Sequence, residues 1–190
     1  MSKRGREQFK KYKFLLRVIS SFVRILPSKS RVKCFYRLRY AKGKIGMALR
    51  YCVLSTIAKK IGDNVSIHEG AFLLNPQNFD FGDNVSIHPM CYLDAQGGIS
   101  IGSDVSIAHG ATLLSFDHLY RDHDVFIKDQ GVVPKPLFIK DNVWIGSKVT
   151  VLGGVTVESG CVLAAGAVIT KNTEKDSIMA GVPARKIGDR

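Results

Sequence analysis

The sequence predicts a mainly β protein, a parallel β-helix of about five coils that follows a basic, partly helical extension. Three observations lead to this fold class. An aliphatic or Phe side chain returns every six residues, the corner of each repeat is usually Gly, Asn or Asp, and positive charge is concentrated ahead of the repeats. A fixed short period is typical of solenoid proteins. The chain therefore divides into an extension, residues 1–60, and a repeat domain, residues 61–190.

The six-residue repeat runs from Ile61 to Glu174 and is interrupted once. Its first position is apolar in all fifteen regular units, a period that no ordinary amphipathic strand or helix produces. These positions are Ile61, Ile67, Leu73, Phe81, Ile87, Leu93, Ile101, Ile107, Leu113, Ile139, Ile145, Val151, Val157, Leu163 and Ile169. The interruption, residues 114–138, is polar and predicts a loop that leaves the solenoid, and residues 175–190 form a C-terminal tail.

The fourth position of each unit marks a corner. It is Gly, Asn or Asp in ten of twelve units, and these residues tolerate a left-handed backbone. The fifth position is small and apolar, as in Val65 and Ala71. A short strand, a tight corner and a small inward residue predict a triangular coil of three units. Two eight-residue units, LLNPQNFD and LDAQGGIS, make the first two coils 20 residues each, 61–80 and 81–100.

The net charge of +12 belongs to the extension. Residues 1–60 hold 18 Lys and Arg against one acid, whereas residues 61–190 hold 10 against 15. This asymmetry indicates an anionic partner for the extension. Apolar residues at helical spacing predict a basic amphipathic helix that Pro27 stops. They are Phe9, Tyr12, Leu15, Leu16, Ile19, Phe22, Val23 and Leu26.

Two interpretations of this helix remain open. Residues 1–27 could lie on an anionic membrane surface, or the apolar stripe could pack on the repeats or on another subunit. Nucleic acid is not expected, because the aromatic residues lie on the apolar stripe and no recognised motif is present. Residues 31–60 are expected to cap the open end of the solenoid.

The four cysteines show no CxxC spacing, and Cys91 and Cys161 fall where other units have small core residues. We therefore expect a reducing, cytoplasmic compartment. No signal peptide and no apolar run of about 20 residues is evident, so any membrane contact is expected to be peripheral, at the inner face.

The repeats resemble the hexapeptide-repeat acyltransferases, and most closely the sugar and polysaccharide O-acetyltransferases of the maltose and galactoside type. The similar stretches are YLDAQGGISIG (92–102), VWIGSKVTVLGGVTV (143–157), AAGAVITK (164–171) and AGVPARKIG (180–188). The resemblance implies a left-handed β-helix, a homotrimer with sites between subunits, and acetyl-CoA as acyl donor with no metal.

The interrupting loop carries the candidate catalytic residue. In the resembling enzymes a His at the start of this loop deprotonates the acceptor hydroxyl, and His118 occupies that place. A neutral imidazole suits the role, because its ordinary pKa of about 6.5 leaves it able to accept a proton at cell pH. Asp117, Asp122, Asp129 or a backbone carbonyl could orient the ring, and His123 is the reserve candidate.

Other histidines raise a metal-binding alternative. His68 and His88 are one coil apart and should stack on one outer strand, with His109 one residue past the next equivalent position, Ala108. Three imidazoles converging on zinc would indicate a β-helix carbonic anhydrase. That alternative is disfavoured, because stacked neighbours do not converge and because the anhydrases lack the WIGS and GVPA segments. His88 and Asp94 are instead candidate acceptor-binding residues, although Asp94 could equally be a solvated corner aspartate.

The resemblance also implies a donor site along the repeats. Ala108, Ser147 and Ala165 would meet the pantetheine arm, and Thr170, Lys171 and Arg185 would meet the nucleotide end, where cations suit phosphates. Trp144 could wall the channel or simply pack on the surface. The sequence thus predicts an acetyl-CoA-dependent O-acetyltransferase acting on a sugar of a glycan or polysaccharide precursor. N-acetylation of an amino sugar is the nearest alternative, followed by the zinc anhydrase and a non-catalytic membrane scaffold.

Overall fold

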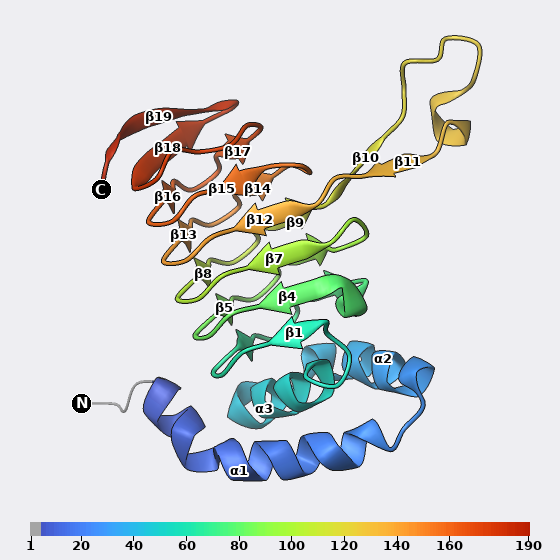
Figure 1. The fold of residues 1–190 in the computed structure, drawn as a ribbon, viewed down its shortest axis with the longest axis vertical. Coiled ribbons are helices and arrows are strands. Elements are labelled where there is room, and N and C mark those ends of the chain that lie inside the picture. The colour runs from blue at the N-terminus through green and yellow to red at the C-terminus, as the bar shows by residue number, and fades with distance from the viewer. Residues whose placement is uncertain (1–4) are drawn as a thin grey trace.

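In a computed structural model, which describes residues 5–190, the chain forms a parallel β-helix with three helices packed at one end (Figure 1). The β-helix has three faces, named here sheets A, B and C. Sheet A contains β1 (Lys60–Ile61), β4 (Phe79–Phe81), β7 (Ile99–Ile101), β12 (Leu137–Ile139) and β15 (Thr156–Val157). Sheet C contains β3 (Phe72–Leu74), β6 (Tyr92–Asp94), β9 (Thr112–Leu114), β14 (Thr150–Val151) and β17 (Val168–Ile169).

Sheet B has seven strands and includes the C-terminal hairpin. It contains β2 (Ser66–Ile67), β5 (Ser86–Ile87), β8 (Ser106–Ile107), β13 (Trp144–Ile145), β16 (Val162–Leu163), β18 (Ser177–Gly181) and β19 (Ala184–Asp189). Within the coils, consecutive strands go to different sheets, so each sheet pairs strands from successive coils, as Ile67 with Ile87 and Ile87 with Ile107. The predicted fold class, a parallel β-helix of five coils with an N-terminal helical region, is confirmed.

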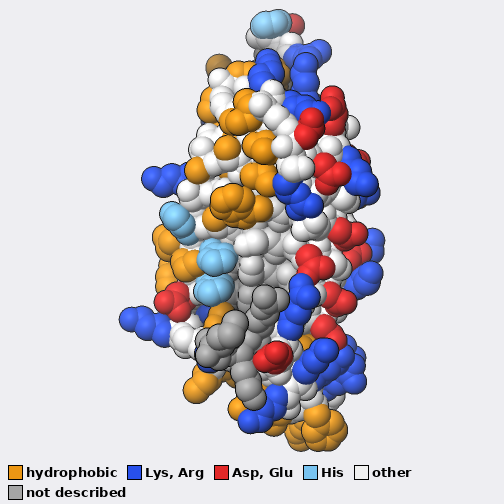
Figure 2. Space-filling view, turned by 90° about the vertical axis from the view of Figure 1, so that its left-hand side faces the viewer, with side chains coloured by type: hydrophobic (Ala, Val, Ile, Leu, Met, Phe, Trp, Pro, Cys, Tyr) orange, Lys and Arg blue, Asp and Glu red, His pale blue; other side chains and the backbone are white. Residues whose placement is uncertain are grey.

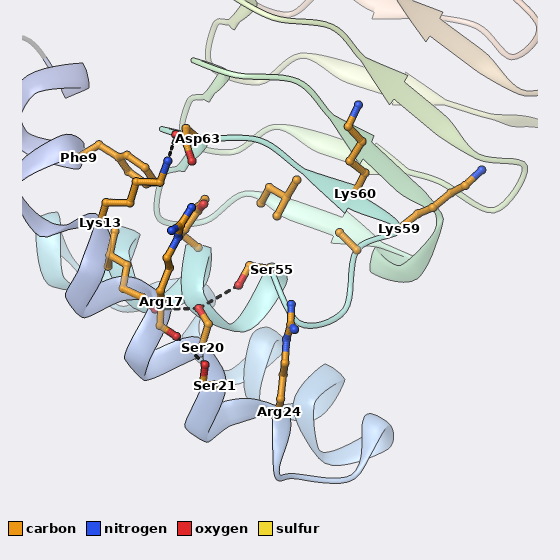
Figure 3. Close-up of a pocket in the computed structure, with 14 residues that line it drawn as sticks. Phe9, Lys13, Arg17, Ser20, Ser21, Arg24, Ser55, Lys59, Lys60 and Asp63 are labelled. Atoms are coloured by element: carbon orange, nitrogen blue, oxygen red, sulfur yellow. Dashed lines mark hydrogen bonds and ion pairs between the residues drawn. The ribbon is translucent and has the colours of Figure 1, made fainter.

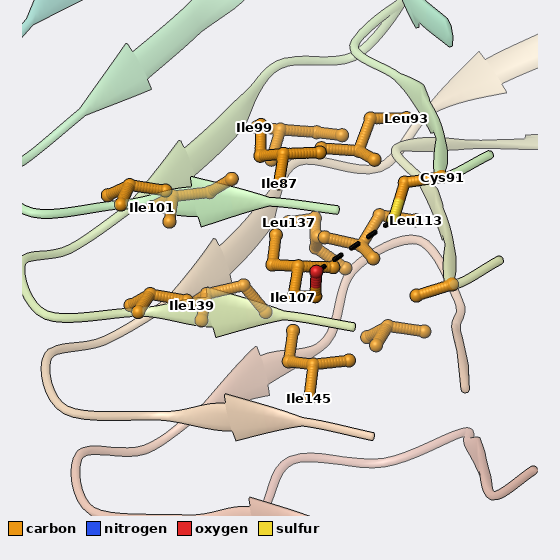
Figure 4. Close-up of a cluster of buried hydrophobic side chains, with 14 of the residues drawn as sticks. Ile87, Cys91, Leu93, Ile99, Ile101, Ile107, Leu113, Leu137, Ile139 and Ile145 are labelled. Atoms are coloured by element: carbon orange, nitrogen blue, oxygen red, sulfur yellow. Dashed lines mark hydrogen bonds between the residues drawn. The ribbon is translucent and has the colours of Figure 1, made fainter. Parts of the chain in front are cut away.

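The six-residue period is the spacing of inward side chains. Fourteen of the fifteen apolar positions are buried, and Ile61, in the first strand, is half-buried. Successive coils stack these side chains in columns along the axis (Figure 4). The small residues after each corner, including Cys91 and Cys161, are buried with them, and all four cysteines are free thiols. Burying a side chain of this size stabilises the fold by about 1.5–3 kcal/mol, so the column is the main source of stability.

The corners adopt the left-handed backbone that their residues predict. Eleven of the twelve fourth positions have positive φ, and these include Met90 (61°) and Lys148 (56°), which have no intrinsic preference for that region. Backbone hydrogen bonds from neighbouring coils hold both corners, as Gly110 N to Pro89 O and Lys148 N to His109 O. The exception is Asn172. Its Oδ1 accepts a hydrogen bond from Thr156 N where the chain leaves the last coil.

The extension folds into α1 (Gly5–Arg24), α2 (Ser28–Arg37), a short 3-10 helix η1 (Leu38–Tyr40) and α3 (Gly43–Leu54). One side of α1 packs on α3. Phe9 meets the ring of Tyr51 edge-on with centroids 5.1 Å apart, and Ser55 Oγ donates to Ser20 Oγ at 3.0 Å. An ion pair between Lys13 and Asp63 joins α1 to the first coil. No helix within residues 5–190 is long and apolar enough to cross a membrane.

Arg50 of α3 closes the terminal coil. Its guanidinium is almost completely buried, and it donates to Ile67 O at 2.9 Å, to Leu38 O at 2.8 Å and to Ala41 O at 2.7 Å. Burial lowers the pKa of Arg50 from its ordinary value. The side chain therefore satisfies carbonyls of the first coil and of the preceding helical segment at once.

The interruption of the repeats projects from the β-helix (Figure 1). It consists of β10 (Phe116–His118) and β11 (Val132–Pro134), an antiparallel pair, joined through a polar segment that contains the 3-10 helix η3 (Ile127–Asp129). A smaller insertion carries the 3-10 helix η2 (Pro76–Asn78). Both insertions leave the β-helix at the corner between sheets C and A.

Candidate active site

A cavity of about 640 Å3 lies at the base of the projecting loop. Residues from β10, from the loop and from β11 and its continuation line it, and they include Asp117, His118, Asp122, Asp129, Gln130 and Lys135. The hairpin pairing of β10 with β11 creates this cavity, because it brings residues 116–118 opposite residues 132–134. A ligand of the size of a sugar ring could therefore approach His118 directly.

His118 ends β10 and is exposed to solvent. Its register partner is Val132, and its ring meets the ring of Phe116 edge-on with centroids 6.0 Å apart. These contacts fix the backbone of the histidine while leaving its ring accessible. The structure thus places the predicted base at a cavity wall, and the catalytic role itself stays a prediction.

The carboxylate of Asp117 is already occupied. Oδ2 forms an ion pair with Lys135 Nζ at 2.7 Å, and Oδ1 accepts a hydrogen bond from the backbone N of His118 at 2.9 Å. The hydrogen bond from Lys135 holds the pKa of Asp117 below its ordinary value. Within residues 5–190 no hydrogen bond joins a carboxylate to the His118 ring. Asp117 therefore anchors the hairpin.

Gln130 organises the rest of the loop. Its Nε2 donates to the carbonyls of Asp122 and Val125, both at 2.7 Å, and its Oε1 accepts from Asp122 N at 3.2 Å. Asp122 Oδ1 accepts from Asp124 N at 2.9 Å, which forms a tight turn. His123 is exposed on this turn and does not line the cavity. The structure therefore separates the reserve candidate from His118.

The base of the loop is tied to the LDAQGGIS insertion. The buried hydroxyl of Ser115 donates to Asp94 O at 2.8 Å and accepts from Gly97 N at 2.9 Å. Gly97 lies so close to the Ser115 carbonyl that a Cβ there would collide with it. The two insertions thus support each other at the corner between sheets C and A.

Asp94 is not the solvated corner aspartate that was one expectation. It is 8% exposed, and Oδ1 accepts hydrogen bonds from Asn75 Nδ2 at 2.8 Å and from Gln96 N at 3.1 Å. The correction has a simple cause: the eight-residue units fold back over the corner and cover the carboxylate. Its acceptor-binding role remains a prediction.

His68 and His88 stack as predicted, with ring centroids 4.9 Å apart and an interplanar angle of 9°. Both follow strands of sheet B and are half-buried, whereas His109 is exposed one residue past their column. In Figure 2 histidine side chains gather on one face beside hydrophobic side chains. Within residues 5–190 no group of three or more His, Cys, Asp or Glu could hold a metal ion.

The His68 ring is expected to titrate below the ordinary histidine range. Burial, then repulsion by His88 and Arg50, lower its pKa. Because the neutral form is favoured in the folded state, its contribution to stability is complete above the ordinary pKa and is lost as the pH falls through the lowered value. In His88→Gln the pKa of His68 should rise but stay below the ordinary value, since burial remains. A histidine NMR titration measures this, and an unchanged pKa would show that the stack has no electrostatic effect.

The predicted donor residues follow one corner of the β-helix, between sheets B and C. Ala108, Ser147 and Ala165 lie there in three successive coils, where Ala108 N donates to Ile145 O and Gly166 N to Ser147 O. Trp144, on the outer side of β13, is in register with Ser106 and Val162 and is exposed. His88 lies in the same column, one coil before Ala108. The structure therefore brings these residues and His88 onto one edge of the β-helix, named here the donor edge.

The remaining donor residues lie near the C-terminal end. Thr170 and Lys171 are exposed directly after β17, and Arg185 is exposed on β19, with its guanidinium donating to Ala184 O at 2.9 Å. Both locations are in the last coil and the closing hairpin. Arg185 lies at the end of the donor edge, because its register partner Ala180 directly follows the sheet B column. Thr170 and Lys171 follow a strand of sheet C and therefore lie at the corner between sheets C and A, away from that edge.

One chain does not assemble these parts into one site. The cavity at His118 includes none of the predicted donor residues and not His88. The His118 loop leaves from the corner between sheets C and A, and the donor edge is the corner between sheets B and C. Sheet C separates them within the chain.

Sequence reasoning missed Lys135 and Gln130, which line the cavity, and Ser115, which ties the base of the loop to the LDAQGGIS insertion. Lys135 stands between Pro134 and Pro136 where the loop returns, and this placement was the one visible signal. Its ion pair with Asp117 closes across the hairpin, so it depends on a pairing that the loop composition does not predict.

Comparison with known proteins supports the repeat assignment. Residues 137–171 match the family model of the bacterial transferase hexapeptide, described as six repeats. A probable acetyltransferase of Mycobacterium tuberculosis is 41% identical over 78 residues. That match covers 41% of this chain and 26% of the relative, so the chain aligns with about a quarter of the relative's length.

Two solved structures share the fold over most of the chain. A galactoside acetyltransferase in complex with coenzyme A has a TM-score of 0.76 at 24% identity, covering 90% of this chain and 82% of its own. A hexapeptide-repeat acetyltransferase of Vibrio cholerae complexed with acetyl coenzyme A has a TM-score of 0.73 at 21% identity, covering 92% and 87%. These likenesses extend to the helical extension, which the family model does not include.

Proposed function

We propose that this chain, which belongs to the hexapeptide-repeat acyltransferases, is an acetyl-CoA-dependent O-acetyltransferase that acts on a sugar hydroxyl, with His118 as general base. The observation that carries the proposal is the exposed His118 at the wall of a sugar-sized cavity, on a fold shared with coenzyme A-bound acetyltransferases. The acceptor class follows from the galactoside acetyltransferase among those structures, and a glycan or polysaccharide precursor is the proposed acceptor.

The proposed reaction is a direct transfer. The neutral imidazole of His118 accepts the proton of the sugar hydroxyl while the oxygen attacks the thioester carbonyl carbon. The tetrahedral intermediate then collapses, the carbon–sulfur bond breaks, and the coenzyme A thiolate takes the proton from the imidazolium. A protein nucleophile is not needed. Three of the four cysteines are buried in the structure, and none lines the cavity.

The donor edge suits an extended acyl carrier. Small residues such as Ala108 and Ala165 let an amide chain approach the backbone, and Arg185 at the end of the edge offers charge-assisted hydrogen bonds to phosphates. Lys171, across sheet C, is a second cation for the nucleotide end. His88 and Asp94 are the proposed acceptor contacts. Within this proposal His88 would meet the sugar from the donor edge.

A homotrimer with sites between subunits would unite the separated parts. The cavity at His118 and the donor edge occupy different corners of one prism, so a second copy has to bring its donor edge to this loop. The exposed aromatic Trp144 on sheet B and Tyr92 on sheet C are apolar surface that such a contact would cover.

A panel of acceptors tests the proposed function. Purified protein is incubated with acetyl-CoA and with galactosides, glucosides, maltose and amino sugars, and the products are identified by mass spectrometry. Acetylation of a hydroxyl supports the proposal, and acetylation of an amine only would replace it with the N-acetyltransferase alternative. The proposal would be contradicted if no acceptor is acetylated and no free coenzyme A thiol is released.

We further propose that helix α1 holds the enzyme at the inner face of the cytoplasmic membrane. The side of α1 that faces away from α3, together with the turn that follows, exposes a continuous set of large apolar side chains. These are Tyr12, Phe14, Leu15, Phe22, Ile25 and Leu26. Lys10, Arg17 and Arg24 follow one flank of that set at helical spacing. The opposite side of the helix packs on α3, rather than on the repeats or another subunit as one interpretation expected, and this leaves the exposed side free for the proposed membrane contact.

Replacing Phe14 and Phe22 by Ser is expected to release the protein from anionic vesicles. These side chains are 81% and 68% exposed, so they contribute little to packing within the chain. Each inserted aromatic ring contributes about 1.5–3 kcal/mol, so losing both should lower the partition at least about a hundredfold. Vesicle flotation measures it. Val182→Ser with Ile187→Ser, equally exposed at the other end of the β-helix, serves as control, and an equal loss in both variants would contradict the α1 surface.

A further inference from the structure

A second cavity, of about 510 Å3, lies between α1 and the first coil, far from the projecting loop (Figures 1 and 3). Basic and hydroxyl side chains form much of its lining, with Arg17, Arg24, Lys59 and Lys60 among them. No residue of the candidate active site lines it. Any ligand that it takes is therefore separate from the acetyl-transfer site, and an inference about it does not rest on the proposed function.

The basic side chains of α1 reach this cavity because of their spacing. Lys13, Arg17, Ser20 and Arg24 recur at intervals of three and four residues, which places them along one side of the helix. Figure 3 shows Arg17 and Arg24 rising from α1 toward the segment that leads into β1, whereas Lys59 and Lys60 point away from α1. The two arginines are thus the cations that face the cavity, and the two lysines border it.

The charges around the cavity are not balanced. Asp63 is the acid in the lining, and it is paired with Lys13. Within residues 5–190, Arg17, Arg24, Lys59 and Lys60 form no ion pair with a carboxylate. Like charges gathered in this way destabilise each other unless an anion lies between them. The hydroxyl groups of the wall already donate within the helices, Ser20 Oγ to Leu16 O at 2.9 Å and Ser21 Oγ to Arg17 O at 3.0 Å. The cationic side chains are therefore the donors that remain for an anion.

We propose that this cavity binds a phosphate group, carried by an anionic phospholipid headgroup or by a soluble phosphate ester. Guanidinium groups form paired, charge-assisted hydrogen bonds with phosphate oxygens, and two arginines on one helix side provide such a clamp. The volume accommodates a glycerol phosphate. The cavity lies on the inner flank of α1, beside the exposed apolar residues of that helix, so a lipid headgroup could enter it while acyl chains stay outside.

Two binding measurements on the full chain test the proposal. Calorimetry measures binding of glycerol 3-phosphate, and a vesicle assay compares binding to phosphatidylcholine with and without phosphatidic acid. The variant Arg17→Gln with Arg24→Gln should weaken binding about thirtyfold, given the usual contribution of two cations near a phosphate surface. The control Lys29→Gln with Lys33→Gln removes the same charge from exposed positions of α2, outside the cavity and outside the surface of α1 proposed to meet the membrane. Its binding should change much less.

The outcomes separate the two ligand sources. Glycerol 3-phosphate binding that depends on the cavity variant indicates a soluble ester, whereas dependence seen only with phosphatidic acid vesicles indicates a headgroup. Ser21→Glu, which keeps both arginines and adds a carboxylate at the wall, should weaken binding in the same way. Thermal unfolding confirms that each variant folds. The proposal is overturned if the wild type binds neither ligand, or if the cavity and control variants lose binding equally.

Discussion

Alanine at position 118 is expected to lower the rate of acetyl transfer by about 10²–10⁴-fold, the usual contribution of a positioned general base. His118 is exposed at the cavity wall, and its backbone is held by the pairing of β10 with β11, so the substitution should leave the loop intact. The loss should appear in kcat, with the KM for acetyl-CoA unchanged, because the donor edge lies on another corner. Steady-state kinetics with the best acceptor of the panel measures both constants.

His123→Ala is the matched control, since it removes an exposed histidine of the same loop that does not line the cavity. It should keep most of the activity. Full activity in His118→Ala would show that the proposed base is wrong, and a selective loss in His123→Ala would move the role to the reserve candidate.

His118→Ala, combined with a second variant, also tests whether sites lie between subunits. Ala165→Phe is expected to obstruct the donor edge, and it leaves His118 unchanged. Neither variant should be active alone, but co-assembly of the two should recover part of the activity, because some interfaces then combine an intact loop with an intact donor edge. Mixed assemblies that stay inactive would indicate that both parts come from one chain.

Arg50→Met is expected to lower the free energy of unfolding by about 3 kcal/mol or more, the scale for leaving several buried carbonyls without donors. In the native structure the guanidinium donates to Ile67 O, Leu38 O and Ala41 O. Methionine has a similar length and no donor, so it retains apolar packing and loses those bonds. Arg50→Lys should recover little, because an ammonium cannot span carbonyls spaced for a planar fork.

Urea denaturation measures this effect. The slope of the unfolding free energy against urea concentration should be the same in wild type and variant. Arg37→Met, an exposed arginine at the end of α2, is the control and should stay within about 0.5 kcal/mol of wild type. Equal unfolding free energies for the two variants would show that Arg50 does not hold the helices to the first coil.

The fold could be predicted from the sequence because its period reports chain geometry directly. Each inward side chain recurs once per unit, and Ile67, Ile87 and Ile107 follow one column without reference to any distant residue. The left-handed backbone at Met90 and Lys148 could not be predicted in this way. Their left-handed corners are imposed by hydrogen bonds from adjacent coils, which outweigh the residues' own preference.

The site was less accessible to sequence reasoning. His118 was identified through a family resemblance, and its place at a cavity depends on a hairpin that no repeat specifies. Lys135 and Ser115 contribute through contacts that cross the hairpin and link two insertions. The buried state of Asp94 likewise depends on how Asn75 folds over the corner one coil earlier.

The projecting loop leaves and re-enters the β-helix almost at one point. Lys135 N donates to Ser115 O at 2.8 Å, and the coils on either side pair in register, Leu113 with Val151. The 19 residues between those two ends can therefore vary in length without any adjustment in the coils, and those beyond the pairing of β10 with β11 can vary in composition while His118 stays in place. During evolution such a segment is interchangeable. Descendants of one scaffold could inherit its use of the donor unchanged while acquiring a new acceptor with each new loop.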